Sequence, residues 1–156
     1  MKSFNNKEIQ KKLSNLNIDL IVTILGSSVK REANVDSKLA NNPEKQKELE
    51  NLIRALSIIY LYSFLESHKG KFNYKDKNNY VGIDKDQLFL YKYVRDCFAH
   101  NYTGELFALE ENNTRTFLGI LGKKEQNSIK IKNSSIILDP KVVHDFFLFI
   151  YNLFKS

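Results

Sequence analysis

NPEKQKELENLIRALSIIYLYSFLESHKG, residues 42–70, is the longest helical pattern in the chain, and the other elements can be arranged around it. Asn42 suits the N-cap, Pro43 suits the first helical position and Gly70 suits a terminator. In the first half, the apolar residues fall on one side: Leu49, Leu52, Ile53 and Leu56. Residues 58–65 are apolar nearly all round, so we expect this end of the helix to lie at the centre of the molecule.

Three further helices are expected around this one. Residues 7–25 carry apolar side chains every three or four positions, as an amphipathic helix requires. Asp84 and Gln87 have the spacing of a capping box, which predicts a helix from there to about His100. Asp139 and Pro140 are a second N-cap and first-turn proline pair, and they precede a strongly apolar last helix.

The segment of about 115–138 has a different sequence pattern. It contains three short apolar runs separated by polar turns: RTFLGILG, SIKIK and SSIILD. Such runs are typical of short strands. The sequence therefore predicts a mainly α protein, a helical bundle in one domain spanning 1–156, with a small antiparallel β insertion before the last helix.

Composition narrows the classes of partner. The chain has 156 residues, a formal net charge of +6 and a sequence pI of about 9.3. A basic chain suits a polyanion such as RNA, although a general bias towards lysine would give the same charge. Cys97 is the single cysteine, so neither an intrachain disulfide nor a zinc cluster is expected. Without a long apolar run or a signal segment, we expect a cytoplasmic protein with no membrane partner.

RDCFAHNY, residues 95–102, is the motif that carries a functional hypothesis. RDCFAH resembles the R-x4-6-H signature of the HEPN superfamily, whose members are compact helical domains. The resemblance implies a homodimer that cleaves RNA without a metal or cofactor. It also implies catalytic roles for Arg95 and His100, with Asp96 as the polar residue that commonly follows the arginine.

Tyr102 extends the motif to R-x4-H-x-Y. This form is found in HEPN toxins encoded beside nucleotidyltransferase antitoxins, where the tyrosine can be nucleotidylated. The β-rich segment departs from the smallest toxins of this type, and it better matches HEPN branches associated with restriction or abortive infection. The resemblance thus implies a role in defence, with an antitoxin, a nucleotidyltransferase or a restriction system as a possible partner.

The chemistry of the motif can also be argued from its residues. RNA cleavage without a metal needs a base for the 2′-hydroxyl, an acid for the leaving oxygen and positive charge on the phosphorane. Histidine exchanges protons near neutral pH, and arginine is a planar phosphate ligand. On a regular helix, however, Arg95 and His100 point about 140° apart and lie about 7.5 Å apart along the axis. Either local unwinding near Asn101 and Gly104 or a two-fold dimer would bring such groups together.

Several other residues are candidates for supporting roles. Asp96 stands four positions before His100 and could orient its imidazole. Glu66, near the end of the long helix, could approach the motif, and Asn101 and Tyr102 follow it directly. A basic loop could contact phosphates, although a solvated surface loop is the commoner explanation of such a segment; its lysines are Lys69, Lys71, Lys75 and Lys77.

Alternatives without catalysis remain open. Arg95 and His100 could be cations favoured by the C-terminal dipole of a helix, and Asp96 and Glu66 could be solvated surface groups. In that case the chain would be a HEPN-like module that binds RNA or protein, or an accessory subunit of a restriction system.

Overall fold

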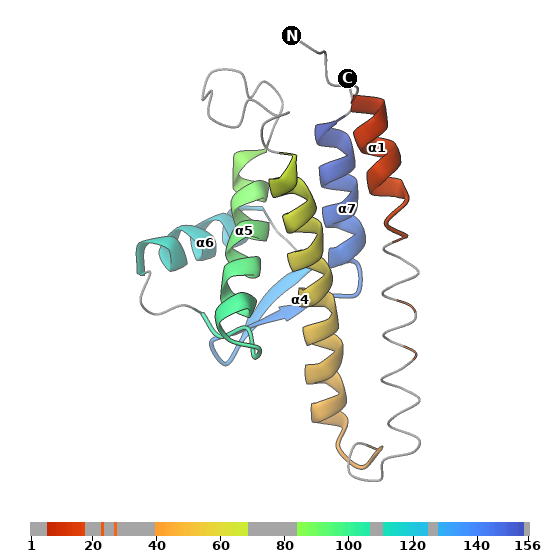
Figure 1. Cartoon of the computed structure of the whole chain (residues 1–156). Coiled ribbons are helices and arrows are strands. Elements are labelled where there is room, and N and C mark those ends of the chain that lie inside the picture. The colour runs from red at the N-terminus through yellow and green to blue at the C-terminus, as the bar shows by residue number, and fades with distance from the viewer. Residues whose placement is uncertain are drawn as a thin grey trace.

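The computed structural model of the chain describes residues 6–17, 23, 27, 40–68, 84–106, 111–124 and 128–154. It is mainly helical, with a two-stranded antiparallel sheet before the last helix, as the sequence predicts (Figure 1). The elements in chain order are α1 (Asn6–Ser14), α4 (Pro43–Ser67), α5 (Lys85–His100), α6 (Glu111–Lys123), β1 (Ile129–Lys132), β2 (Ser135–Leu138) and α7 (Val142–Leu153).

Helix α4 occupies the centre of this arrangement. It runs between α5 and α7, and it also contacts β2 (Figure 1). Helix α1 lies beside α7, where the Gln10 amide donates a hydrogen bond to the Tyr151 carbonyl over 3.2 Å. Buried side chains from all seven elements form one hydrophobic cluster. The end of α4 that is apolar nearly all round supplies Ile58, Leu61 and Leu65 to this cluster, which confirms its predicted central position.

Two of the predicted helix caps are present. The Asn42 side chain accepts a hydrogen bond from the Lys45 backbone N–H over 3.0 Å at the start of α4. The Asp84 carboxylate accepts from the Gln87 backbone N–H, also over 3.0 Å, at the start of α5. These bonds satisfy N–H groups that have no partner within the helix. Both helices therefore begin where the sequence places them.

Helix α7 begins slightly later than predicted. Asp139 accepts from the Lys141 backbone N–H over 3.0 Å, and its own carbonyl accepts from the Val142 N–H over 3.0 Å. The aspartate and Pro140 thus form a turn that precedes the helix, which starts at Val142.

Two sequence predictions about secondary structure are wrong. The first helix does not continue unbroken to Leu25, because it ends at Ser14 and Asn17 has a positive φ of 47°. The run RTFLGILG lies in helix α6 and is not a strand. Phe117 and Ile120 stand three positions apart on the buried side of α6, and the Phe117 ring stacks on Tyr93 of α5 at 4.5 Å. Packing against α5 therefore favours the helical period over the β-branched composition.

The other two apolar runs form the predicted hairpin. Ile129 pairs with Leu138, and Lys132 pairs with Ser135. Both central residues of the turn, Asn133 and Ser134, have positive φ, as a two-residue type I′ turn requires. Alternate residues of β2 face the core, so Ile136 is buried and Ile137 is exposed.

A buried amide attaches this hairpin to α4. Asn51 donates to the Ile136 carbonyl over 2.8 Å and accepts from the Leu138 backbone N–H over 2.7 Å. Arg54, one turn later, donates to the Leu138 carbonyl over 3.0 Å. The backbone of β2 is therefore paired on one edge by β1 and at two of its residues by side chains of α4.

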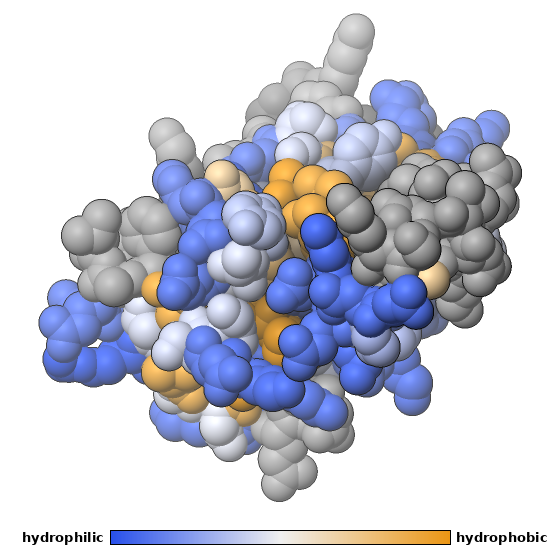
Figure 2. All heavy atoms as spheres, turned by 90° about the horizontal axis from the view of Figure 1, so that it is seen from below, coloured by the Kyte–Doolittle hydropathy of each residue, from blue (hydrophilic) through white to orange (hydrophobic). Residues whose placement is uncertain are grey.

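The surface is mostly hydrophilic where Figure 2 shows it, with hydrophobic residues exposed in a strip between hydrophilic ones. Among the described residues, the large hydrophobic side chains with substantial exposure are Leu56, Tyr60, Tyr102, Leu118, Ile137 and Leu148. None of the described helices combines the length and the apolar character needed to cross a membrane.

Candidate functional site

Arg95 lies on the side of α5 that faces α4. Its Cζ is 4.6 Å from the ring centroid of Tyr62, and its Nη2 is 3.8 Å from Oε1 of Glu66. The Arg95 side chain is 24% exposed. The guanidinium is thus held over an aromatic face while part of it remains open to solvent. The structure also places Glu66 beside Arg95, and the sequence had suggested that Glu66 could approach the motif.

Asp96 contacts two cations. Its Oδ1 lies 2.8 Å from Arg95 Nε, and its Oδ2 lies 3.2 Å from Lys92 Nζ. The Nε–H of Arg95 does not point along this contact, so Nε is buried without a hydrogen bond and the attraction is ionic. Together with Glu66, Asp96 therefore places negative charge on two sides of the guanidinium. These contacts orient Arg95, and the role of Asp96 in orienting His100 stays a prediction.

His100 is the last residue of α5 and is exposed. The helix is regular up to this point, because the Asn101 N–H still donates to the Cys97 carbonyl over 2.8 Å. The local unwinding that would have turned His100 towards Arg95 is therefore absent. On the regular helix, the two side chains of one chain leave in directions about 140° apart.

The turn after α5 is closed by its own side chains. The Asn101 Oδ1 accepts from the Thr103 backbone N–H over 3.0 Å and from the Thr103 hydroxyl over 2.8 Å. The Asn101 amide also donates to Glu105 over 2.9 Å. Asn101 thus has a supporting position, since it fixes the chain directly after His100. Tyr102, between these residues, is 73% exposed.

Gly104 fixes the turn against the rest of the molecule. Its φ is +67°, and a Cβ at this position would lie 2.4 Å from Cζ of the buried Phe98 ring. Only glycine fits both requirements. The Gly104 carbonyl accepts from the Ile136 N–H, and the Leu106 N–H donates to the Ser134 carbonyl, each over 2.9 Å. The hairpin therefore anchors the segment that follows His100, a role that the sequence did not reveal.

The four lysines predicted to contact phosphates lie outside the described residues: Lys69, Lys71, Lys75 and Lys77.

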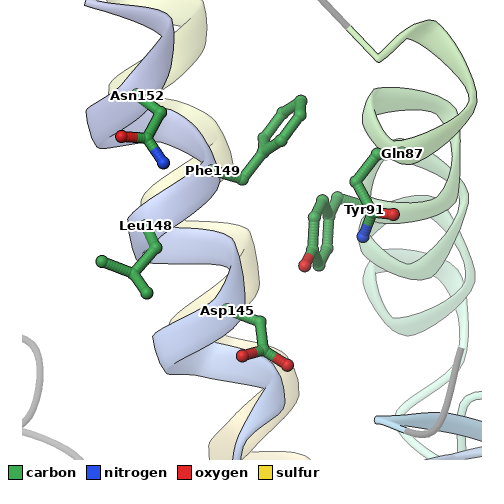
Figure 3. Close-up of a pocket in the computed structure, with 6 residues that line it drawn as sticks. All are labelled: Gln87, Tyr91, Asp145, Leu148, Phe149 and Asn152. Carbon is green, nitrogen blue, oxygen red and sulfur yellow. The ribbon is translucent and has the colours of Figure 1, made fainter. Parts of the chain in front are cut away.

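A hollow of about 310 Å³ lies between α5 and α7, which we call the α5–α7 hollow (Figure 3). Its lining residues are Gln87, Tyr91, Asp145, Leu148, Phe149 and Asn152. Neither Arg95 nor His100 is among them. The sequence did not reveal this site, because the two helices that form it are far apart in the chain. The local signals were the helical spacing of Gln87 and Tyr91 on α5 and that of Asp145, Leu148, Phe149 and Asn152 on α7.

Tyr91 is the most perturbed titratable group of the hollow. Burial raises the pKa of its phenol, the Gln87 side chain acts to lower it, and the negative charge of Asp145 raises it further. The phenol therefore remains protonated at neutral pH. Its ring is stacked on Phe146 at 4.0 Å, which fixes its position in the wall.

Within the described ranges, no three His, Cys, Asp or Glu side chains are grouped so that they could hold a metal ion. Comparison of the chain with known protein families, with curated proteins and with solved structures found no match.

Proposed function

We propose that the protein is a metal-independent endoribonuclease of the HEPN type, in which Arg95 and His100 act in a groove formed by two copies of the chain. The observation that carries this proposal is the geometry of Arg95. Tyr62, Glu66 and Asp96 hold its guanidinium in one place while leaving part of it accessible. An accessible imidazole follows five residues later on the same regular helix.

The dimer follows from this same helix. Because Arg95 and His100 of one chain point about 140° apart, one phosphate cannot readily meet both. A two-fold axis places the same surface of two chains face to face, so that the guanidinium of one copy can approach the imidazole of the other. Such a groove would contain two arginines and two histidines.

Two imidazoles meet the needs of the reaction. A neutral His100 would take the proton of the ribose 2′-hydroxyl as its oxygen bonds to phosphorus. A protonated His100 from the other copy would give a proton to the 5′-oxygen as the P–O5′ bond breaks. Arg95 would stabilise the charge of the phosphorane. The products would be a 2′,3′-cyclic phosphate and a 5′-hydroxyl.

Glu66 and Asp96 would serve as positioning residues. They balance the charge of Arg95 and limit the rotation of its side chain, so that less freedom is lost when a phosphate binds. Tyr102 is exposed two residues after His100 and is accessible for nucleotidylation, which would place a bulky anion beside the histidine. Such a modification by a partner nucleotidyltransferase would suit a toxin or another defence protein.

Cleavage of RNA in the presence of EDTA tests this proposal. We expect Arg95→Ala and His100→Ala each to lose activity by roughly 100-fold or more. Arg115→Ala is the matched control, because it removes one positive charge from an exposed helix surface, and it should retain activity. Cleavage by folded His100→Ala at the wild-type rate would overturn the assignment.

Mixing wild type with His100→Ala tests the shared groove. A heterodimer of the two keeps both arginines but has one histidine, whereas the proposed reaction uses the imidazoles of both copies. We therefore expect heterodimers to be inactive, so that an excess of His100→Ala lowers the activity of the wild type. Unchanged wild-type activity while the two chains form heterodimers would show that the two imidazoles do not act across an interface.

A non-catalytic RNA- or protein-binding module is the second candidate. The observation that favours it is that Arg95 already has two carboxylate partners and an aromatic contact, as a structural arginine often does. In this case the wild-type protein would leave RNA intact. Overexpression of the wild type, Arg95→Ala and His100→Ala would then give equal growth.

A further inference from the structure

We propose that the α5–α7 hollow binds a guanine base of the RNA strand. This inference rests on the proposed function, which it deepens by naming the base that the strand presents beside the site. The volume of the α5–α7 hollow, about 310 Å³, is at the lower end of the range for small-molecule sites. A single nucleotide is an appropriate occupant for a hollow of this size.

The hollow combines two aromatic rings with several polar side chains. In Figure 3, the rings of Phe149 and Tyr91 lie in the space between the two helices. The Asp145 carboxylate lies below them, the Gln87 amide lies beside the Tyr91 ring, and Asn152 lies on α7 above Phe149. The Phe149 ring is only partly buried, so a flat base can stack on it.

The polar groups favour guanine over the other bases. A carboxylate only accepts hydrogen bonds, and it has two oxygens side by side. The Watson–Crick edge of guanine presents two adjacent donors, N1–H and the N2 amino group. In adenine, cytosine and uracil, each donor on that edge stands next to an acceptor, which would face a carboxylate oxygen unfavourably.

The amides can complete this recognition. Gln87 and Asn152 both donate and accept hydrogen bonds, so either can pair with the remaining acceptors of guanine, O6 and N7. The buried Tyr91 phenol is a further polar group in the wall. Single-stranded RNA is commonly recognised by this combination of an aromatic face and polar groups at the base edge.

The position of the hollow connects it with Arg95. Gln87, Tyr91 and Arg95 are spaced four residues apart and form one ridge of α5. Tyr91 and Arg95 are therefore about 6 Å apart along the helix axis. The Arg95 guanidinium lies over Tyr62, and the Tyr62 ring is 6.3 Å from Phe146, which stacks on Tyr91. The hollow and the Arg95 guanidinium thus lie about one helical turn apart along the same ridge of α5.

Binding of nucleoside monophosphates to the full-length His100→Ala protein tests the inference without consuming RNA. We expect guanosine 5′-monophosphate to bind roughly 10-fold more tightly than the adenosine, cytidine and uridine monophosphates. Asp145→Asn, which keeps the shape of the side chain, should abolish this preference. Asp86→Asn is the matched control, because Asp86 is an exposed first-turn aspartate of α5 that does not line the hollow.

Equal binding of all four nucleotides, or an unchanged preference in the Asp145→Asn variant, would overturn the inference. Its failure can be distinguished from that of the proposed function. If the wild type cleaves RNA without any preference for guanosine near the cut, the base site is wrong and the proposed nuclease function stands. If the wild type binds guanosine 5′-monophosphate selectively but cleaves no RNA, the proposed nuclease function is wrong and the base site stands.

Discussion

Helix α4 binds its neighbours through two groups of side chains that differ in kind. In its first half, Asn51 and Arg54 bind the backbone of β2; we call this the hairpin junction. Near its end, Tyr62 and Glu66 contact Arg95, which is paired with Asp96; we call this the arginine junction.

Burial and partner type separate the two junctions. Asn51 is 7% exposed, and its amide pairs with both a donor and an acceptor of the β2 backbone. Arg95 is 24% exposed, and its partners are an aromatic ring and two charged side chains that are themselves partly exposed. Buried, satisfied hydrogen bonds stabilise a fold, whereas partly exposed ion pairs contribute little to stability. The hairpin junction therefore contributes more to stability than the arginine junction, where part of the guanidinium is open to solvent.

The largest expected effect on stability is at the hairpin junction. Asn51→Leu keeps the number and branching of the side-chain heavy atoms but leaves the Ile136 carbonyl and the Leu138 N–H without these partners. We expect the free energy of unfolding to fall by roughly 2–4 kcal/mol, measured by urea denaturation. Asn112→Leu, at an exposed position of α6, is the control and should change stability by less than about 0.5 kcal/mol. Equal effects of both variants would show that Asn51 does not anchor the sheet.

A smaller effect is expected at the arginine junction. Arg95→Ala removes one cation–π contact and two partly exposed ion pairs, so we expect it to lower the free energy of unfolding by about 1 kcal/mol or less. The same denaturation measurement checks this value, and raising the salt concentration should reduce it further. A loss as large as that of Asn51→Leu would identify Arg95 as a structural residue and remove the contrast between the junctions.

The smallest effect is expected at Asp84, which caps the helix that carries Arg95. Burial acts to raise the pKa of Asp84, but hydrogen bonds from Lys124 and the Gln87 N–H outweigh it, and the pKa ends below its ordinary value. A lowered folded-state pKa means that the charged carboxylate stabilises the fold above pH 4 or so and that this contribution is lost as the pH falls through the folded value.

Asp84→Asn tests this dependence. Because asparagine also caps helices and Asp84 is partly exposed, we expect the loss at pH 7 to be below about 1 kcal/mol. Unfolding curves at pH 7 and pH 3 should show that the difference between wild type and variant shrinks at the lower pH. A constant difference would mean that the charge of Asp84 does not contribute.

Some of the fold could be predicted because its signals are local. Asn42, Pro43, Asp84 and Gln87 predicted the starts of α4 and α5, and the structure confirms both. The short apolar runs SIKIK and SSIILD, separated by a polar turn, likewise predicted strands of a small antiparallel sheet. RTFLGILG was misassigned because a short apolar run fits a strand or a helix equally well until its packing partner is known. Tyr93 of α5 supplies that partner for Phe117.

The candidate site could also be predicted only in part. RDCFAHNY identified Arg95 and His100 and placed them at the end of a helix. The motif did not reveal that α5 stays regular through His100, that Tyr62 and Glu66 hold the arginine, or that Gly104 fits beneath Phe98.

The sequence by itself determined where α4 and α5 begin and the order of charged residues along α5, because caps and helical periods depend on residues within about four positions of one another. Only the tertiary structure decided which side chains surround Arg95, how Asn51 binds β2, and that Asp145 and Phe149 lie opposite Gln87 and Tyr91. These contacts join residues that are distant in the chain. They arise from the packing of whole helices around the core, which no local pattern specifies.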